Sequence, residues 1–118
     1  MANIQIVVVE DEPDILEVLR YNLAREGYKV STVQDGTKGL QLIQDQQPDL
    51  VLLDLMLPGM DGLGVCRHLK SSDATKTIPV IMLTAKGEES DIVLGLGIGA
   101  DDYICLLYTS PSPRDVEE

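Results

Sequence analysis

Short apolar runs alternate with stretches of helical periodicity along most of this chain. Five runs have the length and composition of β-strands: residues 4–9, 28–33, 50–53, 79–83 and 102 to about 107. The first, third and fourth are almost continuously apolar, whereas the second alternates between apolar and polar positions. Strands that are apolar throughout are typical of a parallel sheet with both faces covered.

The stretches between these runs predict helices. The first follows the turn at residues 10–14, has Pro13 in its first turn and ends at Gly27. Its apolar face is expected to consist of Ile15, Leu16, Val18, Leu19 and Leu23. Further helices are predicted over residues 36–46, with Leu40 and Ile43 inward, over about 64–71 and over 88–97. Alternating strands and helices predict parallel βαβ units, and hence an α/β fold: a doubly wound five-stranded sheet in a three-layer α/β/α sandwich.

Composition narrows the function classes. The chain has 118 residues, enough for one domain, and the absence of Phe and Trp leaves a core of Val, Leu and Ile. The net charge of −11, with Lys and Arg scattered singly, argues against nucleic-acid binding by this chain itself. No apolar run approaches the ~18 residues of a membrane span, and no basic signal region begins the chain, so a cytoplasmic location is expected.

The cysteines and the single histidine have no metal-binding spacing. Cys66 and Cys105 are far apart, and His68 has no partner motif, so a zinc site is not expected. Cys66 lies within an apolar pattern and is predicted to be a small core residue.

Oxygen ligands follow three of the predicted strands. Glu10 and Asp11 come after the first, Asp54 after the third and Thr84 after the fourth. Because ligands bind beyond the carboxyl ends of parallel strands, these side chains are expected to converge. Neighbouring carboxylates repel one another, and hard oxygen donors favour magnesium (Mg2+). The pattern predicts a magnesium site at which Asp54 is a nucleophile toward a phosphoryl group, with Thr84 donating its hydroxyl to a phosphoryl oxygen.

Simpler interpretations apply to several of these residues. Acids at strand ends are often only solvated loop residues, and Thr is common in strands. Asp61 is placed to be the N-cap of the third helix, and Gly59 and Gly62 are expected to be turn formers. Asp54 is harder to explain in this way, because it follows three apolar residues and its desolvation would cost free energy without a cation or donors.

Residues 4 to about 104 resemble the receiver domain of two-component response regulators. The resemblance is carried by four segments: residues 8–13 (VVEDEP), 48–62 (PDLVLLDLMLPGMDG), 78–85 (IPVIMLTA) and 99–103 (GADDY). It is nearest to the subgroup whose receivers precede a winged-helix DNA-binding domain in transcription factors. It implies a flavodoxin-like strand order, 2-1-3-4-5, in a receiver domain over residues 1–105.

The resemblance also implies a role for each matching residue. Glu10 and Asp11 would be the acid pair around Mg2+, Met56 would add its backbone carbonyl, and Asp54 would take a phosphoryl group from a sensor histidine kinase. Thr84 and Tyr103 would be the switch hydroxyl and switch aromatic.

At the level of the whole protein, the resemblance implies phosphorelay signalling rather than an enzyme. Phosphorylation would rearrange the face formed by the fourth helix, the fifth strand and the last helix, through which such receivers commonly dimerise. DNA would be contacted through an output domain that this chain lacks. The fragment itself would bind neither nucleic acid nor membrane.

The end of the chain departs from the family pattern. A Lys-Pro pair is expected shortly after the switch aromatic, but Leu106 and Leu107 stand there, and no lysine follows Lys86. Residues 106–118 are therefore interpreted as an aberrant tail that replaces the end of the fifth strand and the last helix. Loss of the lysine charge would weaken phosphotransfer, so the alternative is a protein-interaction module of the same fold that is not phosphorylated.

Two other chemistries fit less well. A haloacid-dehalogenase-type hydrolase also has a strand-end aspartate nucleophile and magnesium, but it requires a second acid where Met56 stands. A flavodoxin-type FMN carrier shares the strand order, but the acidic residues Glu10, Asp11 and Glu12 would repel the phosphate of the cofactor.

Overall fold

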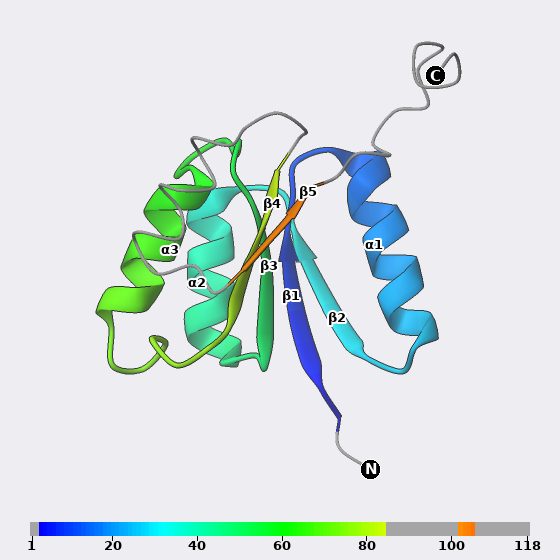
Figure 1. Cartoon of the computed structure of the whole chain (residues 1–118), viewed down its shortest axis with the longest axis horizontal. Helices are drawn as coiled ribbons and strands as arrows, with labels where there is room; N and C mark the ends of the chain where they lie inside the picture. The colour runs from blue at the N-terminus through cyan, green and yellow to red at the C-terminus, as the bar shows by residue number, and fades with distance from the viewer. Residues whose placement is uncertain (1–2, 85–101, 106–118) are drawn as a thin grey trace.

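The computed structural model describes residues 3–84 and 102–105 (Figure 1). Along the chain its elements are β1 (Gln5–Val9), α1 (Pro13–Arg25), β2 (Lys29–Val33), α2 (Gly36–Gln46), β3 (Leu50–Asp54), α3 (Gly62–Ser71), β4 (Val80–Thr84) and β5 (Asp102–Cys105). The helix predicted over 88–97, the end of the fifth strand after Cys105 and the tail at 106–118 lie outside the described residues. Within those residues, no helix has both the length and the apolar character that crossing a bilayer requires.

The five strands form one parallel sheet in the order β2-β1-β3-β4-β5, which confirms the predicted topology. Val9 of β1 lies opposite Val33 of β2 on one side and Leu53 of β3 on the other. The chain thus leaves β1 in one direction for β2 and in the other for β3. Between β1 and β3 the sheet has its topological switch point, where open α/β sheets bind ligands.

Alternate residues of the strands pack into two separate cores. Val7, Val9, Val51 and Leu53 belong to a buried cluster with residues of α2 and α3, such as Ile43 and Cys66. The intervening strand residues pack on the other side against α1: Ile6, Val8, Leu52 and Leu83. Figure 1 shows this division, with α1 on one side of the sheet and α2 and α3 on the other. Both faces are covered, as the apolar strands predicted.

The prediction for Val18 was wrong. Ile15, Leu16, Leu19 and Leu23 pack against the core on the α1 side, but Val18 is 46% exposed. With about 3.6 residues per turn, those four leucine and isoleucine residues form one stripe, and Val18 lies about a third of a turn away from its centre. The helical spacing alone did not show which residues lie at the edge of the buried stripe of α1.

Aspartate side chains cap the two helices that cover one face of the sheet. Asp35 Oδ1 accepts a hydrogen bond from the Lys38 backbone N–H at 2.9 Å, at the start of α2. Asp61 Oδ1 accepts one from the Gly64 backbone N–H at 2.8 Å, at the start of α3. The capping role predicted for Asp61 is confirmed, and α3 begins at Gly62, slightly earlier than expected.

Replacing Asp61 with alanine should lower the free energy of unfolding by about 1 kcal/mol, because an amide of the first turn loses its acceptor. Urea unfolding of the two proteins measures this difference. Asp61→Asn is the matched control, since asparagine caps about as well as aspartate. Equal losses in both variants would show that the negative charge, rather than the cap, matters.

Candidate metal centre

Three carboxylates meet at the switch point of the sheet. Glu10 and Asp11 follow β1 directly, and Asp54 is the last residue of β3. Because Val9 pairs with Leu53, the next residues on the two strands, Glu10 and Asp54, are level with each other. One carboxylate oxygen from each of Glu10, Asp11 and Asp54 lies within 4.8 Å of the others. The structure therefore brings together the three acids that the strand ends predicted.

Glu10 is the buried member of this cluster, with only 2% of its surface exposed. Its backbone N–H donates to the Val33 carbonyl at 3.0 Å, which ties the residue to the end of β2. Its Oε2 accepts a hydrogen bond from the Glu12 backbone N–H at 2.9 Å. Its Oε1 is buried and has no hydrogen-bond partner among the described residues. A carboxylate oxygen in this position is costly unless a cation or a proton meets it.

The pKa of Glu10 reflects that environment. Burial raises the pKa from 4.5 to about 7, and the hydrogen bond from Glu12 opposes part of this rise. The negative charges of Asp54, Asp11 and Glu12 raise the pKa further. A group whose ionisation is disfavoured both by burial and by neighbouring anions is one that a bound cation would stabilise.

Asp54 is half-buried and is affected in the same way. Burial is the main reason why its pKa rises from 3.8 to about 6, and the charge of Asp11 adds to the rise. Hydrogen bonds from the backbone amides of Leu55 and Met56 lower the pKa in part. The Leu55 N–H also donates to the Leu83 carbonyl at 3.3 Å, and the partial exposure of Asp54 leaves its carboxylate open to a reactant.

The donor set fits a small hard cation. All three side chains offer carboxylate oxygens, and the cluster contains neither sulfur nor imidazole. Oxygens bound to one octahedral magnesium ion are about 3 to 4 Å apart, and the three carboxylates lie within 4.8 Å of one another, close to that separation. Glu10 Oε1, which has no partner among the described residues, adds a buried acceptor that such an ion would satisfy.

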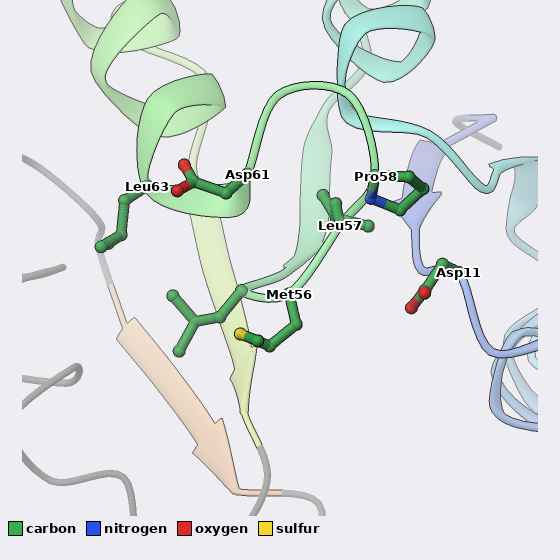
Figure 2. A pocket seen from close by; sticks show the side chains of 7 residues that line it. Asp11, Met56, Leu57, Pro58, Asp61 and Leu63 are labelled. Atoms are coloured by element: carbon green, nitrogen blue, oxygen red, sulfur yellow. The ribbon is translucent and has the colours of Figure 1, made fainter.

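A groove of about 500 Å³ begins at Asp11 and runs along the β3–α3 loop, residues 55–61 (Figure 2). It is lined by Asp11, Leu55, Met56, Leu57, Pro58, Asp61 and Leu63. Met56 is 77% exposed and lies in the same groove as Asp11. The loop after Asp54 thus borders the acid cluster, although the metal-binding role of the Met56 carbonyl stays a prediction.

For the two expected switch residues, Thr84 and Tyr103, the structure gives the position of the backbone. Thr84 ends β4, the strand next to β3, and Leu83 pairs with Asp54. Tyr103 lies on β5 and pairs with Met82. The side chains of Thr84 and Tyr103 are outside the described part of the structure, so their switch roles stay predictions.

The glycines around the β3–α3 loop allow closer backbone packing than the sequence indicated. Gly59 has a φ of 78° and is a turn former, as expected. Gly62 instead permits a close approach, since a Cβ there would lie 2.1 Å from the Asp54 carbonyl oxygen. Gln34 and Gly36 also contact the site, through the carbonyls of Asp11 and Pro58, and no such contact was predicted. The Asp-Gly pair at the start of the second helix was the only available signal, and it indicates a helix start equally well.

Comparison with known proteins agrees with this geometry. The family model of the response regulator receiver domain matches residues 6–105. The chain is 49% identical over 115 residues to the alkaline phosphatase synthesis transcriptional regulatory protein PhoP of Bacillus subtilis (strain 168), which covers 97% of the chain and 45% of that protein. It is 47% identical over 107 residues to the phosphate regulon transcriptional regulatory protein PhoB of Rhizobium meliloti (strain 1021). This match covers 91% of the chain and 47% of that protein. The chain thus spans about half the length of these curated relatives.

A solved receiver-domain structure with the same fold contains a bound magnesium ion. The receiver domain of sensor histidine kinase PA1611 from Pseudomonas aeruginosa PAO1 was determined with a magnesium ion coordinated in its active-site cleft. It superposes with a TM-score of 0.81 at 30% identity, over 98% of this chain and 92% of that domain.

Proposed function

This chain belongs to the response regulator receiver domain family, and we propose on that basis that it accepts a phosphoryl group on Asp54. The donor is a phosphohistidine of a sensor histidine kinase. The observation that carries the proposal is the convergence of Glu10, Asp11 and Asp54 at the switch point, with Asp54 the half-buried member beside the groove.

Magnesium is the proposed cofactor, held by the carboxylates of Glu10, Asp11 and Asp54 and by the backbone carbonyl of Met56. The magnesium-bound cleft of a receiver domain with the same fold supports this choice. When bound, the ion supplies positive charge that shields the carboxylates and the incoming phosphoryl group from each other.

The transfer needs little covalent chemistry from the protein. A carboxylate oxygen of Asp54 forms a bond to phosphorus, the bond from phosphorus to the histidine nitrogen breaks, and its electron pair stays on the imidazole. The Leu55 and Met56 amides lower the pKa of Asp54 in part and so favour the ionised carboxylate that makes this attack. Thr84 then donates its hydroxyl to a phosphoryl oxygen, and Tyr103 follows as the switch aromatic, altering the face that carries β5.

The wider role we propose is signal transduction in the cytoplasm, without an enzymatic activity of its own. The names of the two transcriptional relatives support a parent protein that regulates transcription. In that protein, DNA would be bound by an output domain outside the receiver fold, and receivers would pair through the face that carries β5.

A second candidate is a protein-interaction module that is not phosphorylated. It is favoured by one observation, the Leu106-Leu107 pair in the place where the family has Lys-Pro. Without that lysine, the bound phosphoryl group lacks one neighbouring positive charge.

Intact mass separates the two candidates. The chain should acquire a single phosphoryl adduct when incubated with acetyl phosphate and Mg2+, and EDTA should suppress the adduct because the unshielded carboxylates repel the donor. Hydroxylamine should remove the adduct, as expected of an acyl phosphate. A chain that stays folded with Mg2+ and takes up no phosphate would support the interaction module.

A further inference from the structure

The junction between β2 and α2, residues 33–39, contacts the backbone of the acid pair although it supplies none of the three carboxylates. The Val33 carbonyl accepts a hydrogen bond from the Glu10 backbone N–H at 3.0 Å. The Gln34 side-chain amide Nε2 donates to the Asp11 carbonyl oxygen at 3.4 Å. Consecutive residues of the junction therefore hold consecutive residues of the acid pair.

The same junction holds the β3–α3 loop on the other side of the site. The Gly36 backbone N–H donates to the Pro58 carbonyl at 2.9 Å. The contact is so close that a Cβ on Gly36 would lie 1.6 Å from the Met60 carbonyl oxygen. A Cβ on Gly59 would lie 2.8 and 2.9 Å from the two carboxylate oxygens of Asp35. The loop that carries Met56 thus packs directly against the start of α2.

The start of α2 is itself fixed in place. The Asp35 side chain caps Lys38, and the Asp35 carbonyl accepts from the Gly39 backbone N–H at 2.8 Å. A Cβ on Gly39 would lie 2.9 Å from both methyl groups of Val9, the residue before Glu10. The first turn of α2 is therefore anchored on β1 at the point where the acid pair begins.

We propose that residues 34–36 are the positioning element of the metal centre, holding Asp11 and the loop that carries Met56 at the separation that one divalent cation requires. The inference rests on the proposed function, because it concerns the same metal. Magnesium demands near-ideal octahedral geometry, and replacing groups that orient the ligands commonly costs about 10–100-fold in metal affinity. Gln34 and Gly36 donate to the backbone carbonyls of Asp11 and Pro58 and supply none of the three carboxylates, so they are positioning residues.

Titration of the full chain with Mn2+, followed by the electron paramagnetic resonance of the free ion, measures the affinity directly. Gly36→Ala must push the loop away and should raise the Mn2+ dissociation constant about tenfold or more. Gln34→Ala removes a single long hydrogen bond and should raise it about threefold. Gln44→Ala, an exposed glutamine on α2, is the matched control and should leave the dissociation constant unchanged.

A second control, at Thr75, distinguishes an effect on the stability of the fold from an effect on the positions of the metal ligands. Thr75 is buried in the α3–β4 connection, at the amino ends of the strands, where its Oγ1 donates to the Leu69 carbonyl at 2.7 Å. Thr75→Val should lower the free energy of unfolding and leave Mn2+ affinity unchanged. A purely structural role for Gly36 would make Gly36→Ala behave in the same way.

The outcomes distinguish the inference from the function on which it rests. A folded Gly36→Ala variant with wild-type affinity overturns the inference, and if that variant does not fold, equal affinities of Gln34→Ala and Gln44→Ala overturn it. A wild-type chain that binds no Mn2+ overturns the metal centre of the proposed function, and the inference with it.

Discussion

Asp54→Asn will remain folded but acquire no phosphoryl adduct under conditions in which the wild-type chain acquires one. The amide nitrogen and oxygen of asparagine are poor nucleophiles toward phosphorus, so no acyl phosphate can form at this position. The fold should tolerate the change, because the Leu55 and Met56 amides that bond to Asp54 can donate to the remaining carbonyl oxygen. Intact mass after incubation with acetyl phosphate and Mg2+ measures the loss.

Asp45→Asn is the matched control for this experiment. Asp45 is an exposed acid on α2, and its replacement should leave adduct formation unchanged. If Asp54→Asn acquired the adduct as fast as the wild-type chain, the phosphoacceptor would be another acid, and peptide mapping would identify it. Asp11, the exposed member of the cluster, would then be examined first.

Glu10→Gln should stabilise the metal-free chain while it weakens metal binding. Burial raises the pKa of folded Glu10 to about 7 from an ordinary 4.5, so the folded chain binds a proton more tightly than the unfolded chain does. Ionisation of Glu10 therefore costs stability as the pH rises from about 4.5 to about 7, and at higher pH the cost is at most ~3 kcal/mol. Glutamine removes that cost, keeps an oxygen for the Glu12 amide, and can donate toward Asp54.

Thermal unfolding in EDTA between pH 4 and pH 8 measures this effect. The wild-type chain should lose stability across this range, and Glu10→Gln should lose less, with the remaining fall between about 3.8 and about 6 due to Asp54. Added Mg2+ should raise the melting temperature of the wild-type chain more than that of the variant, since a ligand that binds only the folded state stabilises it.

Glu26→Gln serves as the reference, because Glu26 is an exposed acid at the end of α1, away from the cluster. Equal pH profiles for Glu10→Gln and the wild-type chain would mean that Glu10 has the same pKa in the folded and the unfolded chain, so that burial does not raise it.

Local patterns in the sequence were enough to predict the architecture. Strand runs and helix-period stretches are properties of neighbouring residues, so β1 to β4 and α1 to α3 were predicted to within a few residues. Val18 shows the limit, because the edge of a helix stripe depends on what the helix packs against. The convergence of Glu10, Asp11 and Asp54 was also predictable, since parallel strands bring their carboxyl ends to one edge.

The way these carboxylates are held, and how readily they ionise, depends on contacts that form only in the folded chain. The burial of Glu10 and the hydrogen bonds from Gln34 and Gly36 to the Asp11 and Pro58 carbonyls depend on contacts between segments far apart in the chain. Hydrophobic periodicity does not predict such contacts. Where two backbones approach closely, the sequence shows only a glycine, and glycine also occurs for many other reasons. Local sequence patterns therefore identify the groups that can bind a metal and a phosphoryl group, whereas the packing of β1, α2 and the β3–α3 loop sets the separation and the charge of those groups.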